Sequence, residues 1–215
     1  MSDSDSVLIW EWPHRLWHWA FVGAIGVSLY TGLADDLELM DLHITTGVGV
    51  IGLLGFRLGW ALWGGRYVRA KQYRTSPVAI WRHLRGQPRI GTAHSAPGAA
   101  MALAIFTAVC VQVGSGLFAS DDIFTDGPFA HYLDDAGVDL ATAIHTRMYW
   151  IVLTLIVVHL SAVGWYTWRR DPIAQSMLHG RAPLRVAPIT RHYWLRAAMT
   201  AVGAAALLWA ADRYF

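Results

Sequence analysis

Charged residues and cysteine are scarce in this sequence. Only 15% of its 215 residues are charged, and Cys110 is its single cysteine. One cysteine excludes an intrachain disulfide, and it excludes the Cys-x-x-Cys-His motif that attaches c-type haem covalently. The basic residues form no RNA- or DNA-binding motif, so we do not expect nucleic acid as a partner. We also find no internal repeat, no low-complexity segment and no stretch that would form a separate soluble domain.

Apolar residues are abundant instead. They make up 55% of the chain, which also contains 12 tryptophans. This composition is typical of membrane proteins, in which tryptophan is enriched where the lipid meets water. The first residues lack the basic region and the small-residue cleavage site of a signal peptide, so we expect them to be retained.

Five apolar stretches predict five transmembrane helices. They cover about residues 16–33, 43–63, 97–119, 144–168 and 193–211, close to the lengths that a bilayer requires. We therefore predict an all-α integral membrane protein with a four-helix bundle in residues 1–181. Residues 182–215 would form a linker and an additional C-terminal transmembrane helix. Residues 171–185 are expected to include a short helix at the membrane surface.

The charges between these stretches alternate in sign. Residues 64–93 contain seven Lys or Arg and no acid, and residues 169–192 are also basic. Residues 34–42 and 120–143 instead carry four and six acidic residues and no Lys or Arg. Because basic loops stay on the cytoplasmic side of a membrane, we predict that the N-terminus is cytoplasmic and that the C-terminus lies outside.

Two histidines interrupt the long, almost uncharged apolar stretch at residues 144–168. His145 and His159 are fourteen residues apart, which on an α-helix is close to four turns, so both imidazoles leave the same side. They are about 21 Å apart along the axis, roughly two-thirds of the hydrocarbon thickness. Ionisable residues inside a membrane are often functional, although either histidine alone could equally well bond a neighbouring helix.

The predicted topology sorts four membrane histidines into two pairs by depth. His18 and His159 fall near the cytoplasmic surface, and His43 and His145 fall near the opposite surface. Unrelated buried polar residues would rarely sort in this way. Histidine is a common haem ligand, and two histidines on one iron leave no open position, which suits electron transfer. We therefore predict that the bundle binds two b-type haems non-covalently, with each pair ligating one iron.

Other residues near these histidines are candidates for contacts with the haems. Gly47 lies one turn after His43 on the same face, where a macrocycle needs space, although small residues in membranes more often serve helix packing. Arg15 and Arg57 lie near the cytoplasmic surface and could pair with haem propionates or extend to the lipid headgroups. We favour the propionate role for Arg15. Arg147 is the only cation beside the outer pair and is a propionate candidate there.

The sequence resembles the bacterial cytochrome b561 / nickel–iron hydrogenase b-type cytochrome family over about residues 7–181. The resemblance rests on W-E-W-P-x-R-L-W-H-W at 10–19, H-x-x-x-G and F-R-x-x-W-x-x-W-G between 43 and 64, A-H-S-A-P-G at 93–98, and the His145–x13–His159 spacing. It implies a di-haem subunit of the bacterial inner membrane that passes electrons between the quinone pool and a periplasmic redox partner. It also implies that His18 and His159 ligate the inner haem, and His43 and His145 the outer one.

The resemblance and the loop charges favour an electron-transfer subunit. Its periplasmic partner would have a basic surface, as some c-type cytochromes do, or be a hydrogenase or another dehydrogenase or reductase. The alternative is a stand-alone superoxide–quinone oxidoreductase, but the acidic outer loops would repel superoxide and attract a cationic partner. A small channel or transporter would leave the paired histidines unexplained. His94 opens the third span on the inner side and could exchange protons with a bound quinone, or be an interface residue.

Overall fold

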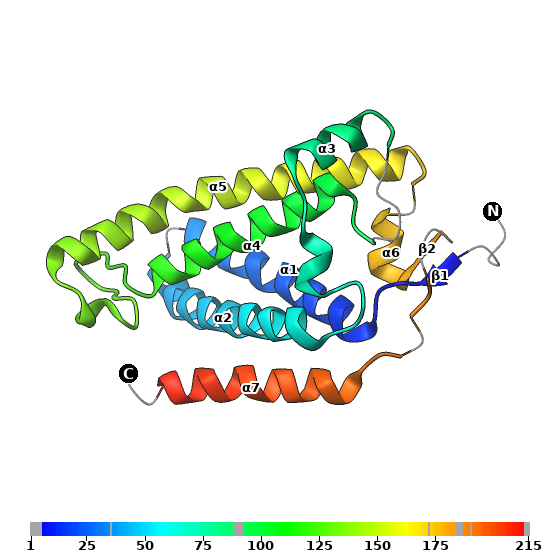
Figure 1. Cartoon of the computed structure of the whole chain (residues 1–215). Coiled ribbons are helices and arrows are strands. Elements are labelled where there is room, and N and C mark those ends of the chain that lie inside the picture. The colour runs from blue at the N-terminus through cyan, green and yellow to red at the C-terminus, as the bar shows by residue number, and fades with distance from the viewer. Residues whose placement is uncertain are drawn as a thin grey trace. The chain divides into compact units, whose positions relative to one another are not determined.

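The structure of this chain is a computed structural model that describes residues 6–34, 36–87, 93–171, 173–183, 187–189 and 191–212. Helices make up almost all of the regular structure in these residues (Figure 1), so the predicted all-α class is confirmed. Among the charged residues that predict the topology, Asp35, Arg89 and Arg185 lie outside the described residues.

Four of the described helices are long and apolar enough to cross a membrane. They are α1 (Trp12–Leu33), α2 (Met40–Trp63), α4 (Ala96–Gly116) and α5 (Asp135–Trp168). They coincide with the first four predicted spans, and the chain is therefore an integral membrane protein.

The largest departure from the predicted boundaries is at the start of α5. This helix has 34 residues and is about 51 Å long, well above the roughly 30 Å thickness of the hydrocarbon core. It begins at Asp135 rather than at residue 144 because Asp134 caps it. The Asp134 carboxylate accepts a hydrogen bond from the Gly137 N–H at 2.9 Å, which satisfies one of the N–H groups that a helix start leaves free.

The fifth predicted helix is present as α7 (Trp194–Asp212). Its apolar part, Trp194–Trp209, is shorter than the four membrane candidates, so its crossing of the membrane stays a prediction. The short helix that we predicted in residues 171–185 is α6 (Ile173–His179). The other described elements are α3 (Pro77–Leu84), the 3-10 turns η2 (Leu37–Leu39), η3 (Ala70–Tyr73) and η4 (Ala130–Tyr132), and the strands β1 (Ser6–Leu8) and β2 (Arg181–Pro183).

The chain divides into two compact units, which we describe separately. Unit 1 comprises Met1–His18, Arg57–Ile105 and Leu155–Thr200, and unit 2 comprises Trp19–Phe56, Phe106–Thr154 and Ala201–Phe215. Each unit therefore takes segments from all four membrane helices, and each unit contains one of the two predicted histidine pairs.

In unit 1 the segment before α1 is held by distant parts of the chain. β1 pairs antiparallel with β2, and the N–H groups of Ile9 and Trp10 donate to the Gly180 carbonyl at 2.8 and 3.0 Å. The Glu11 carboxylate accepts a hydrogen bond from the Gly65 N–H at 2.8 Å. The sequence predicted neither strand. We call residues 6–11 the N-terminal cap, because they are folded onto the end of the helices.

In unit 2 each of the four membrane helices contributes a buried apolar side chain. These side chains are Phe21 of α1, Val50 of α2, Val109 of α4 and Val152 of α5. The connection from α4 to α5 folds back on itself, because the Gly127 N–H donates to the Ala119 carbonyl at 2.7 Å. This connection is therefore a defined structure.

α7 packs against glycines of α2. In unit 2, a Cβ atom added at Gly52 would lie 2.7 Å from Cδ1 of Leu208. In unit 1, a Cβ atom added at Gly59 would lie 2.7 Å from Cγ2 of Thr200, and the Thr200 hydroxyl accepts a hydrogen bond from the Trp63 indole N–H at 2.7 Å. These glycines thus permit close helix packing, as small residues commonly do in membranes.

Candidate functional site

His43 and His145 face each other within unit 2. Their ring centroids are 6.1 Å apart and their ring planes are inclined by 83°. An imidazole nitrogen binds a transition metal at about 2 Å, so two rings on opposite sides of one metal ion have centroids roughly 6 Å apart. The structure therefore brings this predicted pair together at a separation that suits one metal ion between the rings.

Backbone carbonyls hold one nitrogen of each ring. His43 Nδ1 donates to the Ser28 carbonyl at 3.1 Å and also lies 3.1 Å from the Thr31 hydroxyl. His145 Nδ1 donates to the Gln112 carbonyl at 2.9 Å. Because a carbonyl only accepts, these two bonds require the proton on Nδ1, which would leave Nε2 with the lone pair that a metal requires. The Gln112 side-chain amide nitrogen also lies 3.2 Å from Nδ1 and 3.4 Å from Nε2 of His145. Sequence analysis missed Ser28, Thr31 and Gln112, since their contacts with the rings depend on which helices lie side by side and leave no pattern of residue types.

Glycines provide room for both rings. A Cβ atom added at Gly32 would lie 2.9 Å from Cε1 of His43, and one added at Gly116 would lie 2.7 Å from Cε1 of His145. A larger residue at either position would therefore displace an imidazole. A Cβ atom added at Gly47 would meet nothing within 4 Å, so there is open space on the helix face one turn after His43.

His18 and His159 both belong to unit 1, and they lie close enough to interact electrostatically. Both side chains are half-buried. Within the described part of the chain, no group of three or more His, Cys, Asp or Glu side chains is placed to hold a metal ion. Each pair could therefore supply only two ligands, as the axial ligands of a haem iron do.

Arg57 and Arg15 are both buried in unit 1. The Arg57 guanidinium lies 5.5 Å from the ring centroid of Trp17 and 4.9 Å from that of Tyr73. Its Nη1 has no hydrogen-bond partner among the described residues. Arg15 instead donates from Nε to the Met177 carbonyl at 3.2 Å. A buried cation needs an anion or acceptors, so Arg57 could still take a propionate, and the propionate contact of either arginine stays a prediction.

Arg147 lies in unit 2, but its side chain is exposed. Its Nη1 donates to the Ala143 carbonyl of its own helix at 3.0 Å. The structure thus places the cation at the surface of α5, and its predicted contact with a propionate stays a prediction.

Two further histidines of unit 1 are enclosed by aromatic rings. The His14 side chain is buried and stacks on Trp17, with ring centroids 5.7 Å apart. The His94 ring centroid lies 4.9 Å from that of Trp10 and 4.5 Å from that of Tyr73. Sequence analysis did not find this enclosure, because Trp10, Tyr73 and His94 come from separate parts of the chain and only the fold brings them together.

Residues 9–180 match the family model described as prokaryotic cytochrome b561. The chain belongs to the prokaryotic cytochrome b561 family. The match covers all four paired histidines and ends before α7, which is an addition to the family region. No curated protein matches the chain.

Membership of the cytochrome b561 family identifies a membrane b-type cytochrome that acts in electron transfer and implies haem b. The residues present fit this group. In unit 2, His43 and His145 face each other, a backbone carbonyl lies at Nδ1 of each ring, and the space beside Gly47 is open. In unit 1, Arg57 offers a buried cation. Imidazole nitrogen is an ordinary axial ligand for haem iron.

Proposed function

We propose that this cytochrome b561 binds two b-type haems and transfers electrons across the bacterial inner membrane, between the quinone pool and a periplasmic redox partner. The observation that carries this proposal is the distribution of the histidines. Each compact unit contains one pair, His18 with His159 in unit 1 and His43 with His145 in unit 2. A single haem would need only one of these pairs.

The roles of the histidines follow from their geometry. When bound, haem b supplies a one-electron redox couple at its iron. His43 and His145 would hold one haem, and His18 and His159 the other. Two histidines on one iron leave no position for oxygen or another small substrate, so electron transfer is favoured over ligand chemistry. The backbone carbonyls at Nδ1 of His43 and His145 would fix the tautomer and the orientation of each ring.

The charged loops support a cytoplasmic N-terminus, which would put the His18–His159 site on the inner side of the membrane. We propose that the quinone binds near this site. His94 supports this place, because its ring lies beside Tyr73 and Trp10. An imidazole next to a phenol can exchange the protons that accompany quinone reduction.

A stand-alone superoxide–quinone oxidoreductase is the alternative function. The acidic loop between α4 and α5 argues against it. Asp122, Asp126, Asp135 and Asp139 line one hollow there, and this negative charge would repel superoxide and attract a positively charged protein.

Haem content tests the proposal. We expect purified protein to contain two haems per chain by pyridine haemochrome and to titrate in two redox steps. His43→Ala and His145→Ala should each remove the same haem, and His18→Ala and His159→Ala should each remove the other, because two ligands share each iron.

The control is His131→Ala, which changes an exposed loop histidine and should leave both haems in place. One haem per wild-type chain would contradict the proposal. So would a His43→Ala protein that kept both haems while a His94→Ala protein lost one.

A further inference from the structure

The connection between α4 and α5 presents two large apolar side chains to solvent. Ile123 is 76% exposed and Phe124 is 74% exposed. Both lie outside the four membrane helices, and acidic residues flank them on both sides. Exposed apolar groups within a polar rim are typical of surfaces that bind another molecule.

The backbone around these two residues is held in one shape. We call residues 120–126 the tip loop. The Asp121 carboxylate accepts hydrogen bonds from the N–H groups of Ile123, Phe124 and Thr125 at 3.0, 2.8 and 2.8 Å. These bonds lower the pKa of Asp121 below its ordinary value, and the bond from Ile123 contributes most. A loop that is already ordered loses little conformational entropy when it binds a partner.

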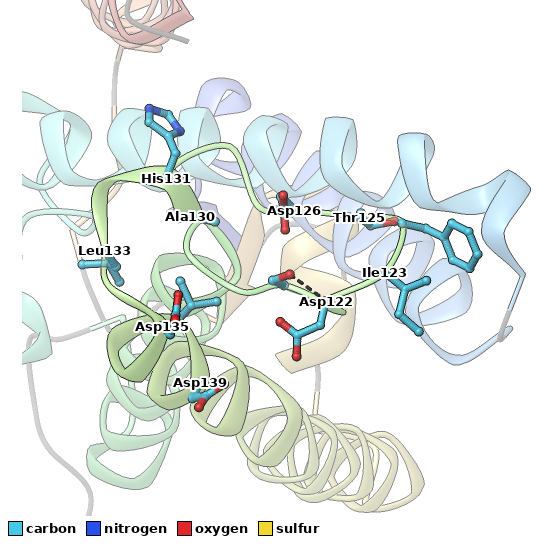
Figure 2. A pocket seen from close by; sticks show the side chains of 12 residues that line it. Asp122, Ile123, Thr125, Asp126, Ala130, His131, Leu133, Asp135 and Asp139 are labelled. Carbon is cyan, nitrogen blue, oxygen red and sulfur yellow. Dashed lines mark hydrogen bonds between the residues drawn. The ribbon is translucent and has the colours of Figure 1, made fainter.

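A hollow lies beside the tip loop. It has a volume of about 490 Å³ and is lined by carboxylates of the loop and of the first turns of α5. Figure 2 shows Asp122 and Asp126 on the loop, Asp135 and Asp139 on the helix, and Ile123 at the far end of the loop from His131. The hollow is large enough for a long basic side chain, and its charge favours one.

The tip loop is bonded directly to the helix that carries His145. The Ser120 N–H donates to the Thr142 hydroxyl at 3.0 Å, and that hydroxyl donates to the Ser120 carbonyl at 3.3 Å. Thr142 lies one helical turn before His145. A partner seated on the tip loop would therefore dock close to the haem that His43 and His145 are proposed to hold.

We infer that the tip loop and the acidic hollow form the docking surface for the electron-transfer partner. The partner is a redox protein with an apolar patch, where electrons are exchanged, and a surrounding ring of Lys and Arg. Ile123 and Phe124 contact the apolar patch, and the hollow receives a basic side chain from the ring. This inference rests on the proposed function, because it names the partner of that same electron path.

The charges favour a protein over the lipid surface as the occupant. A loop that enters the headgroup region usually pairs its apolar residues with Lys or Arg, which anionic lipids attract. Residues 120–143 contain six Asp and no Lys or Arg. The same carboxylates attract a basic protein and accelerate its association.

The test uses the full-length haem-loaded protein in lipid nanodiscs and a basic mitochondrial cytochrome c as the probe. Binding is measured at low and at high ionic strength. Ile123→Ser with Phe124→Ser should weaken binding about tenfold at both ionic strengths, because apolar contacts are not screened by salt. Asp122→Asn with Asp126→Asn and Asp139→Asn should weaken binding only at low ionic strength. Leu84→Ser, at an equally exposed site on α3 (75%), is the matched control and should bind like the wild type.

A nitroxide at Phe124→Cys, in a Cys110→Ala background, adds an independent measurement. We expect the label to be reached by a water-soluble nickel chelate and shielded when the cytochrome is added. If the label is instead reached by oxygen dissolved in the lipid, the loop lies in the membrane and the inference is overturned. Unchanged binding by the apolar double variant, or no binding by the wild type, would also overturn it. Haem content and haem reduction in the same samples test the proposed function separately, so intact haems with unchanged binding would refute the docking surface alone.

Discussion

The absence of a side chain at Gly116 leaves space for the His145 imidazole. Because a Cβ atom there would lie 2.7 Å from the ring, Gly116→Ala should displace His145 and lower the haem content associated with this ligand pair. The cost of the added methyl is about 1–3 kcal/mol. The haem-to-protein ratio and the redox titration measure it, and the His18–His159 haem should stay. Gly49→Ala is the control, because a Cβ atom there meets nothing within 4 Å. A Gly116→Ala protein with two unaltered haems would show that the ring tolerates the methyl group.

Glu11 is the most buried acidic side chain in the part of the chain that the structure describes, at 2% exposure. Burial raises the pKa of its carboxyl from 4.5 to about 7, although the Gly65 N–H, the Trp60 side chain and the nearby Arg196 and Arg69 guanidiniums oppose the shift. The carboxylate oxygen Oε2 has no hydrogen-bond partner among the described residues. The charged form is therefore poorly accommodated, and the protonated form is the stable one below neutral pH.

The pH dependence of stability tests this state of Glu11. Because its pKa is higher in the folded chain than in the unfolded chain, its stabilising contribution is complete below pH 4.5 and is lost as the pH rises through 7. Glu11→Gln mimics the protonated acid and should remove this loss, which is at most roughly 3 kcal/mol. Thermal unfolding in detergent between pH 5 and pH 8.5 measures the effect. The control Glu38→Gln, at an exposed glutamate, should show the same dependence of stability on pH as the wild type. If Glu11→Gln also lost stability with rising pH as the wild type does, the prediction would be contradicted.

Among the helices, α7 depends on small residues of α2 for its contact. Gly52 and Gly55 face Leu208 and Ala204, and Gly52→Val would place its Cβ 2.7 Å from the Leu208 side chain. We expect this change to loosen α7 and to lower stability by about 1–3 kcal/mol. Limited proteolysis of the segment before α7 and the thermal midpoint measure it. Gly49→Val should change neither, since that position is open, and an equal effect of both variants would disprove a specific contact with α7.

The helices could be predicted from the sequence and the strands could not. Apolar runs of membrane length predict helices directly, and α1, α2, α4 and α5 all match them. The start of α5 was missed because the residues from Asp135 to residue 143 are too polar for an apolar run, and their helix depends on a cap at Asp134. β1 and β2 have three residues each, and the residues that pair are far apart in the sequence. No local pattern of residues therefore predicts them.

That His43 lies beside His145 could also be predicted, because the depth of each histidine follows from the order of the spans and the helical rise. The ligand roles of the two pairs stay predictions. The surroundings of the pairs could not be predicted. The Ser28 and Gln112 carbonyls, and the enclosure of His14 and His94, depend on which helix faces which. Such contacts depend on tertiary packing, which cannot be predicted from the spacing of residue types.

For the chain as a whole, the orientation in the membrane decides which of the two proposed haems would meet which proposed partner. Reporter fusions after Arg74 and after Arg181 should report the cytoplasm, because basic loops are retained there. Fusions after Asp126 and after Phe215 should report the periplasm. The last fusion also tests whether α7 crosses the membrane, and Phe215 itself lies outside the described residues. A periplasmic signal after Arg74 would reverse the assignment of inner and outer haem.

The N-terminal cap has a consequence for the order of events during synthesis. Glu11 can reach Gly65 once α1 and α2 have been made, but β1 cannot pair until residues 181–183 have left the ribosome. Contacts between residues so far apart in sequence form late. The cap is therefore completed only after all four membrane helices have been translated. Until then residues 6–8 lack their strand partner, so we expect the start of the chain to reach its folded position only after residue 183 has been made.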